Sequence, residues 1–237
     1  MNEINDYWSD IDKRLENLSK KGFTKLPSLK KLDLDKLSNE IVFEMKNSTF
    51  KESGKAHEKL LNYLQINNFL TPKLFELARN KFFYKGVKLN QYHVARLVLP
   101  GNSKEKYRAH FDSHLFTLVL PIKIPVKLND EIHNGELIFF PNVRKLPANE
   151  LINLIQKLYF KIYANEKGIK RLMKKREIYV ESFESFEPIL FFGKTFLHTN
   201  HPVSKHSAHE RLTLLSHFFD TSPKFGVGNI LRILRKR

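Results

Sequence analysis

The sequence predicts a mainly β fold with added helices, in which a jelly-roll-like barrel or sandwich forms the core. Seven or eight short β-branched and aromatic runs, separated by turn signals, begin near residue 90 and extend over about 130 residues. The residues before them have helical periodicity, and one helical segment interrupts the strands. These observations predict a β core at residues 86–222, preceded by helices and carrying a helical insertion.

The N-terminal region, residues 1–85, is expected to be helical and to pack on the core. Apolar residues recur at helical spacing between Tyr7 and Leu18. Two further helices are expected at Glu58–Leu64 and at Pro72–Asn80, the second with its proline near the start. Residues 20–36 are rich in lysine and leucine and contain Pro27, so we expect a linker or an irregular loop there.

The strands of the core are read from short β-branched and aromatic runs and from the turn signals between them. Turn signals include Pro100-Gly101-Asn102 and Asn134-Gly135. The expected strands are Tyr92–Leu99, Tyr107–Asp112, Leu115–Ile124, Glu136–Phe140, Glu177–Phe183, Ile189–Phe192 and Arg211–Asp220.

A helical insertion is expected at residues 147–176, between two of these strands. Apolar residues from Leu151 to Ile162 repeat every three or four positions, which predicts helix over Asn149–Lys175. The last ten residues of the insertion, Lys167–Arg176, are strongly basic.

Composition narrows the function classes. The 237 residues include 41 Lys and Arg against 25 Asp and Glu, a formal net charge of +16, and 41% are hydrophobic, which excludes a disordered basic protein. There is no cysteine, so a disulfide scaffold, a zinc ribbon, an iron–sulfur site and a thiol nucleophile are all excluded. A catalytic metal would need histidine and carboxylate ligands. The polar N-terminus and the short apolar runs predict a soluble, cytoplasmic protein.

The strongest chemical signal is the pair His110-x-Asp112. On a strand these two side chains point to the same face. An imidazole and a carboxylate side by side supply two thirds of a two-histidine, one-carboxylate set, which suits Fe(II) and leaves coordination positions open. A distal histidine, His198, is followed by Arg211, which opens an apolar strand and could bind a carboxylate bidentately.

In these residues the sequence resembles the Fe(II)/2-oxoglutarate-dependent oxygenases, over residues 90–220. The resemblance is strongest at His110-x-Asp112, at the Gly135-Glu136-Leu137 strand and at the hairpin from His198 to Arg211. It implies a double-stranded β-helix (a jelly-roll or cupin-like core), with Fe(II) on the two histidines and Asp112. It also implies O₂ and 2-oxoglutarate as cosubstrates, with the far carboxylate of 2-oxoglutarate on Arg211 and the Thr213 hydroxyl.

The identity of the distal ligand stays open between two histidines. The family pattern His-x-x-x-Pro-Val selects His198, four residues before Pro202, but its distance from Arg211 is then slightly longer than usual. His201 gives the usual spacing but stands directly against Pro202. We favour His198 and keep His201 as the second choice.

Further polar residues on the expected strands have two readings each. His114 continues the parity of the His110-x-Asp112 pair and His217 that of Arg211, so either could reach the cavity, although packing is the favoured role. The remaining residues of this kind, for which cosubstrate or substrate binding competes with a surface role, are Tyr92, Arg96 and Arg108.

The resemblance implies an oxygenase that releases succinate and CO₂ from 2-oxoglutarate while it oxidises a substrate. Asp112 occupies the position at which halogenating relatives have a small residue, so hydroxylation or a related oxidation is favoured. The sequence is most similar to bacterial small-molecule hydroxylases. We expect a small metabolite, anionic ones included, or a sugar- or lipid-linked group as substrate.

The positive charge is concentrated in the insertion and in a C-terminal tail, residues 223–237. The tail alternates apolar residues with arginine and could contact an anionic membrane peripherally. Nucleic acid is not expected as a partner, because neither basic cluster interleaves aromatic residues with the charge. The alternative function is a non-enzymatic basic β-sandwich that binds nucleic acid or an anionic membrane surface. The sequence does not predict an oligomeric state.

Overall fold

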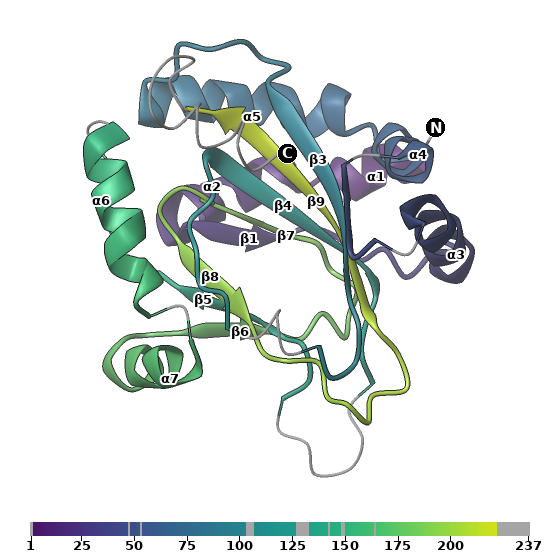
Figure 1. Cartoon of the computed structure of the whole chain (residues 1–237). Helices are drawn as coiled ribbons and strands as arrows, with labels where there is room; N and C mark the ends of the chain where they lie inside the picture. Colours follow the sequence, from purple (N-terminus) through teal and green to yellow (C-terminus); the bar gives the residue numbers. More distant parts are fainter. Residues whose placement is uncertain are drawn as a thin grey trace.

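A computed structural model describes residues 2–46, 48–52, 54–102, 107–126, 133–141, 143–147, 150–163 and 165–221. It contains two antiparallel β-sheets with helices around them (Figure 1). Among the described residues, no helix combines the length and the apolar character that a membrane span requires. The basic tail at residues 223–237 lies outside the described residues.

Seven helices and nine strands are described, and Figure 1 labels them in chain order. The helices are α1 (Asn2–Trp8), α2 (Ile11–Lys21), α3 (Leu34–Met45), α4 (Lys55–Tyr63), α5 (Ile66–Phe82), α6 (Glu150–Lys161) and α7 (Glu166–Lys175). The strands are β1 (Phe23–Lys25), β2 (Phe50–Glu52), β3 (Gln91–Val98), β4 (His114–Lys123), β5 (Leu137–Phe140), β6 (Tyr179–Glu181), β7 (Ile189–Phe191), β8 (Leu197–Asn200) and β9 (Arg211–Asp220).

The larger sheet has six strands in the order β1-β7-β4-β9-β3-β2, and the smaller has three in the order β6-β5-β8. Neighbouring strands in the order are antiparallel in both sheets. The order departs from the chain sequence at most positions, so neighbours in each sheet come from distant parts of the chain. Two antiparallel sheets with this crossed order are consistent with the predicted jelly-roll class.

Aromatic side chains join the two sheets. Phe139 of β5 meets Phe191 of β7 edge to face, with ring centroids 4.9 Å apart, and stacks on Phe23 of β1 at 6.1 Å. Phe139 and Phe191 are fully buried. Each such ring contributes about 1.5–3 kcal/mol through the hydrophobic effect, so these contacts hold the sheets face to face.

Helices of the N-terminal region cover the other face of the larger sheet. Phe82 of α5 meets Phe116 of β4 edge to face at 5.8 Å, and Phe75 of the same helix packs on Phe219 of β9 at 5.7 Å. Phe116 and Phe218 are register partners on β4 and β9, so they extend the same buried face. The region therefore shares its hydrophobic core with the sheet.

The segment at residues 20–36 is only in part the linker or irregular loop that the sequence predicts, because residues 26–33 are irregular but residues 23–25 form a strand. Phe23–Lys25 pairs with Ile189–Phe191 as the edge strand β1, directly after Gly22 ends α2 in a left-handed conformation with φ 83°. A three-residue strand is too short to show alternation. Its pairing depends on the free edge of β7, which lies far away in the sequence.

Pro72 lies inside α5, not near a helix start, because the helix begins at Ile66. A proline in a helix interior removes one backbone hydrogen bond and is costly in isolation. Leu70 and Leu74, on either side of it, are both fully buried. Tertiary packing of this helix face offsets the local cost.

Residues 107–112 were expected to form a strand, but the structure has a single bridge there, between His110 and His198. Tyr107 adopts a left-handed conformation with φ 48°, and the Ala109 N–H donates to the Tyr107 carbonyl in a turn. The segment is therefore irregular, and Asp112 takes its position from a separate backbone hydrogen bond to Gly193.

Between β5 and β6 the chain forms two helices, where the sequence predicted one continuous helix. The second, α7, begins after Asn165, whose side chain accepts a hydrogen bond from the Gly168 N–H as an N-cap. Ile169 and Leu172 of α7 are buried with Phe140 of β5 in a second, smaller hydrophobic cluster. Helices α6 and α7 thus lie along the smaller sheet (Figure 1).

Candidate active site

Two separate stretches of chain bring His110, Asp112 and His198 together, and we call this group the His110 cluster. One ligand atom from each residue lies within 4.8 Å of the others. His198 is on β8, and the backbones of His110 and His198 exchange two hydrogen bonds of 3.1 Å. The Asp112 N–H donates to the Gly193 carbonyl at 2.9 Å. Backbone pairing therefore sets the positions of all three side chains.

Both imidazoles direct Nε2 toward the carboxylate. His110 Nε2 lies 3.7 Å from Asp112 Oδ1, and His198 Nε2 lies 3.7 Å from Asp112 Oδ2. The two imidazole ring centroids are 4.3 Å apart. Three donor atoms thus converge on one small volume from two sides of the Asp112 carboxylate.

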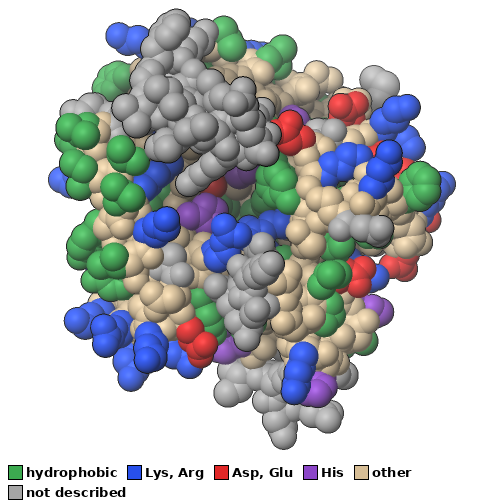
Figure 2. Space-filling model, in the orientation of Figure 1, with side chains coloured by type: hydrophobic (Ala, Val, Ile, Leu, Met, Phe, Trp, Pro, Cys, Tyr) green, Lys and Arg blue, Asp and Glu red, His purple; other side chains and the backbone are tan. Residues whose placement is uncertain are grey.

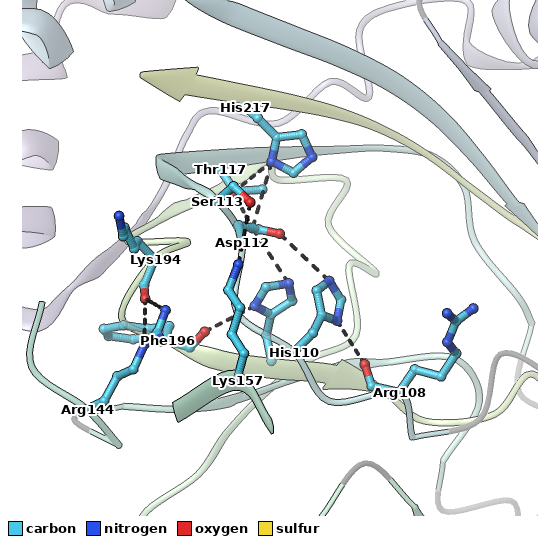
Figure 3. Close-up of polar contacts among 11 residues, drawn as sticks. Arg108, His110, Asp112, Ser113, Thr117, Arg144, Lys157, Lys194, Phe196 and His217 are labelled. Carbon is cyan, nitrogen blue, oxygen red and sulfur yellow. Dashed lines mark hydrogen bonds and ion pairs between the residues drawn. The ribbon is translucent and has the colours of Figure 1, made fainter. Parts of the chain in front are cut away.

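The tautomers of the two histidines follow from their backbone partners. Nδ1 of His110 is 2.8 Å from the Arg108 carbonyl oxygen (Figure 3), and Nδ1 of His198 is 3.2 Å from that of Phe196. A carbonyl oxygen only accepts, so each Nδ1 carries a proton and donates it. In the neutral ring this leaves the Nε2 lone pair available, which is the arrangement of histidines that ligate a metal through Nε2.

The Asp112 carboxylate is buried and held by a hydroxyl group. Thr117 Oγ1 donates to Asp112 Oδ2 at 2.5 Å and lies 3.0 Å from His217 Nδ1 (Figure 3). Burial by itself would raise the pKa of Asp112, but the three neighbouring imidazoles and the Thr117 hydroxyl hold it below its ordinary value. Asp112 is therefore ionised at neutral pH.

The histidines of the cluster are neutral at the same pH. Desolvation, followed by the neighbouring His198, lowers the pKa of His110 to about 4. Desolvation also lowers the pKa values of His198 and His217, against the opposing effect of Asp112. The His110 side chain keeps 46% of its surface exposed, so the cluster is reached from outside. Two neutral imidazoles and one carboxylate form a donor set that needs no deprotonation to bind a divalent cation.

Gly193 allows the close approach of the backbone to this cluster. A Cβ atom at this position would lie 2.7 Å from Asp112 Oδ2 and 2.5 Å from Thr117 Oγ1, which is closer than real Cβ contacts. Any side chain at residue 193 would displace the carboxylate.

The predicted cosubstrate residues lie on the same face of the larger sheet. Arg211, Thr213 and His217 share parity on β9, and all three are largely buried. The Arg211 guanidinium donates from Nη1 to the Gly135 carbonyl at 2.8 Å. Thr213 Oγ1 is buried without a hydrogen-bond partner among the described residues. A hydroxyl that is buried in this way can donate to a ligand.

Arg96 of β3 is the register partner of Thr213, so the two side chains are neighbours on one face. Its positive charge contributes, behind desolvation, to the lowered pKa values of His110 and His198. The sequence analysis named Arg96 without choosing between a binding and a surface role. The structure places it on the side of the sheet that faces the His110 cluster.

His201 belongs to a different group. His133, Glu136 and His201, which we call the His133 cluster, also have ligand atoms within 4.8 Å of one another. The His133 and His201 rings are stacked at 3.8 Å, and Tyr107 Oη lies 3.3 Å from His201 Nδ1. Tyr107, the neighbour of His201, packs in the smaller hydrophobic cluster. The His198 ring instead meets Phe191 of the main core, with ring centroids 5.0 Å apart. His198, not His201, therefore lies beside His110 and Asp112.

Thr117 is the residue that sequence reasoning missed. It stands in the run Leu115–Ile124, which is otherwise almost entirely apolar and buried, and this isolated hydroxyl was the available signal. His217, for which packing was favoured, contacts the site directly, with Nδ1 3.8 Å from Asp112 Oδ2. His114 lies beside it, with ring centroids 5.3 Å apart. Tyr92 stacks on the His217 ring and donates its hydroxyl to Glu52.

Among known proteins, similarity to this chain is found with solved structures. No protein-family model matches the sequence, and no curated protein matches it. Among solved structures, a prolyl hydroxylase from Trichoplax adhaerens in complex with a hypoxia inducible factor peptide superimposes with a TM-score of 0.55 at 11% identity, over 92% of each chain. A Pseudomonas putida prolyl-4-hydroxylase gives 0.51 at 13% identity, over 89% of this chain and 98% of the other.

A third similar structure is the non-heme α-ketoglutarate-dependent carbocyclase SnoK from nogalamycin biosynthesis. It superimposes with a TM-score of 0.50 at 10% identity and covers 93% of this chain and 89% of the other. The superpositions show a shared fold, whereas sequence identities of 10–13% leave the reaction open. They confirm the fold that the sequence resemblance implied: this chain has the fold of the Fe(II)/2-oxoglutarate-dependent oxygenases.

Proposed function

We propose that the protein is an Fe(II)- and 2-oxoglutarate-dependent oxygenase that hydroxylates, or otherwise oxidises, a small metabolite or a sugar- or lipid-linked group. The observation that carries the proposal is the convergence of His110, Asp112 and His198, whose ligand atoms all lie within 4.8 Å of one another. Two histidines and one carboxylate form the donor set of non-haem Fe(II) oxygenases. The shared fold supports the same class.

In this proposal His110 and His198 bind the iron through Nε2, and Asp112 binds it through a carboxylate oxygen. Bound Fe(II), with 2-oxoglutarate and O₂, would supply the oxidising chemistry and release succinate and CO₂. The chain contributes position and charge. Arg108 and Phe196 carbonyls fix the two rings, while Thr117 holds Asp112 in the orientation that presents it to the cation.

The far carboxylate of 2-oxoglutarate would bind on the face of β9 that carries Arg211 and Thr213. Thr213 Oγ1 can donate to it, since this hydroxyl is buried and has no partner among the described residues. Arg211 remains the cationic partner that the sequence favours, and Arg96, directly across from Thr213, adds a second guanidinium on that face. Guanidinium groups bind carboxylates bidentately, which orients the cosubstrate.

The presence of Asp112 supports oxygen transfer over halogenation, because its carboxylate occupies the position that a halide would need. The alternative of a non-enzymatic basic β-sandwich gives no role to the arrangement at this site. Neutral imidazoles locked by backbone carbonyls and a buried ionised carboxylate are costly to assemble without a bound cation. The site therefore supports the enzyme over the binding module.

Optical titration of the metal-free protein tests this function. Anaerobic addition of Fe(II) and then 2-oxoglutarate should give the weak visible absorption band of the iron–2-oxoglutarate chelate, and admission of air should release succinate. Asp112→Ala should lose both signals. Glu136→Gln, a change of the buried carboxylate in the His133 cluster, is the matched control and should keep them. Absence of the band and of succinate with the wild-type protein would reject the oxygenase function.

A further inference from the structure

Helix α6 is inverted relative to an ordinary surface helix, because its polar residues face the protein. Asn153 is buried, and its Oδ1 accepts a hydrogen bond from Arg144 Nη1 at 3.1 Å. Gln156 Oε1 lies 3.4 Å from the same nitrogen, and Lys157 Nζ points at Ser113 Oγ, 3.5 Å away (Figure 3). Hydrogen bonds, together with partly buried side chains such as Phe160, thus attach α6 to the body of the protein.

The opposite side of α6 presents an apolar stripe to solvent. Its members recur at helical spacing and are each between 55% and 66% exposed: Leu151, Ile155, Leu158 and Tyr159, with Ile162 directly after the end of the helix. Figure 2 shows hydrophobic side chains along the edge of the molecule where Figure 1 places α6. A surface helix normally buries such a stripe against the core, and a contiguous exposed one marks a contact with another apolar phase.

Helix α7, next to it, exposes positive charge. It buries Gly168, Ile169 and Leu172 and directs its cations outward. The exposed cations of α7 are Lys167, Lys170, Arg171, Lys174 and Lys175, followed by Arg176. Of these, Lys170 is in an ion pair with Glu166, within the same helix. Figure 2 shows lysine and arginine side chains gathered where Figure 1 places this helix, below the apolar stripe.

We propose that α6 and α7 dock the protein on an anionic lipid bilayer, with the apolar stripe of α6 in the interfacial region and the cations of α7 against the lipid headgroups. An exposed apolar stripe flanked by cations is the arrangement that anionic membrane surfaces bind. A second copy of this chain also carries a formal net charge of +16, so charge favours an anionic membrane over self-association.

Docking in this way would also orient the candidate active site. Lys157 reaches from α6 to Ser113, the residue after Asp112, so the membrane-binding helix is attached to the wall of the site. The docking proposal itself rests on α6 and α7 and is independent of the proposed oxygenase activity.

Vesicle co-sedimentation of the full-length protein tests the proposal. At 150 mM salt, binding is expected with vesicles of 30% phosphatidylserine in phosphatidylcholine and not with pure phosphatidylcholine. Ile155→Gln/Leu158→Gln, which changes two exposed side chains, should weaken binding to the anionic vesicles at least tenfold. Lys174→Gln/Lys175→Gln should weaken it about fivefold per charge removed.

Control variants change exposed residues elsewhere. Phe43→Gln, on α3 at the opposite side of the view in Figure 1, should bind like wild type, as should Lys30→Gln/Lys31→Gln. Circular dichroism melts establish that all variants fold. Three outcomes would overturn the proposal: wild type does not bind anionic vesicles, the α6 variant binds like wild type, or the protein is a dimer that the α6 variant dissociates.

Discussion

Two histidine–carboxylate clusters lie on opposite sides of the β5–β8 pair, and they differ in what their polar atoms already bind. In the His110 cluster, backbone carbonyls accept hydrogen bonds from the Nδ1–H groups of both histidines, so both Nε2 atoms are turned toward Asp112. The His110 side chain is 46% exposed. The ligand atoms of this cluster are therefore held in place by the backbone, and the cluster is accessible to solvent.

In the His133 cluster, the carboxylate has a structural task. Glu136 Oε2 accepts the Asn134 N–H at 2.7 Å, which stabilises the turn before β5. The two imidazoles are nearly parallel, at 6°, and the Tyr107 hydroxyl lies 3.3 Å from one of them. The comparison shows that proximity of ligand types is not enough to define a reactive site, because the neighbours of each ring decide where its free lone pair points.

The sharpest test of this difference replaces each of the two candidate distal histidines by alanine in turn. His198→Ala should weaken Fe(II) binding at least about 100-fold and abolish the chelate band, because it removes a ligand, and even outer-shell changes cost 10–100-fold. His201→Ala should keep the band with near-normal metal affinity. Anaerobic Fe(II) titration measures both, and the reverse result would move the site to the other side of β8.

Thr117 tests whether the carboxylate must be held in place. Thr117→Val keeps the side-chain shape and removes the donor to Asp112 Oδ2, so metal affinity should fall about 10–100-fold. The matched control is Thr199→Val, since Thr199 is equally buried and its hydroxyl has no partner among the described residues. Equal metal affinities in both variants would show that Thr117 is a packing residue.

Thr213 tests the cosubstrate side of the His110 cluster. Thr213→Val should raise the dissociation constant for 2-oxoglutarate about 10- to 150-fold, because a hydrogen bond to a charged group is worth roughly 1.5–3 kcal/mol. Fe(II) affinity without 2-oxoglutarate should not change. Thr199→Val again serves as control, and an unchanged 2-oxoglutarate affinity in Thr213→Val would remove this residue from the site.

A pH titration of unfolding tests the buried histidine His57, which lies beside His93 and away from the His110 cluster. His57 is buried against His93, and desolvation, followed by that neighbour, lowers its pKa to about 3. The unfolded chain, with an ordinary histidine pKa of about 6.5, therefore carries more protons between these two values. The free energy of unfolding should fall as pH decreases from 6.5 toward 3, by up to about 1.4 kcal/mol per pH unit from this residue.

Denaturant unfolding at several pH values measures this slope. His57→Gln should show a shallower decline than wild type, because it removes this buried imidazole. Identical slopes for wild type and His57→Gln would show that His57 is already protonated in the folded protein or does not contribute.

Much of the strand pattern could be predicted, because the long strands are β-branched and aromatic runs that turn signals separate. The expected runs Tyr92–Leu99 and Leu115–Ile124 lie within a residue or two of β3 and β4. The short strands β1 and β2, of three residues each, carry no such signal. They exist because the edges of the larger sheet offer unpaired backbone groups, which the local sequence does not encode.

The residue types of the site could be predicted from the sequence, but the backbone contacts that position them could not. His110-x-Asp112 was recognised by assuming a strand, yet the residues lie in an irregular segment, and the side chains converge because Asp112 bonds to Gly193 and His110 to His198. The close approach that requires a glycine at residue 193 involves residues about 80 positions apart in the sequence.

The sequence by itself determined the chemistry that the protein can use. The lack of cysteine, the His110-x-Asp112 pair and the two later histidines restrict any metal site to imidazole and carboxylate ligands. Local patterns also determine where the long strands and the amphipathic stripe of α6 occur. Each of these follows from residue type and spacing along one segment.

Tertiary structure decided which histidine joins the pair and which way α6 faces. His198 and His201 are three residues apart at the end of one strand, and that offset sends their side chains to opposite sides. The stripe on α6 is exposed because Arg144 and Ser113, from other segments, bind its polar face. Both outcomes depend on partners that are distant in the sequence, so no local pattern records them.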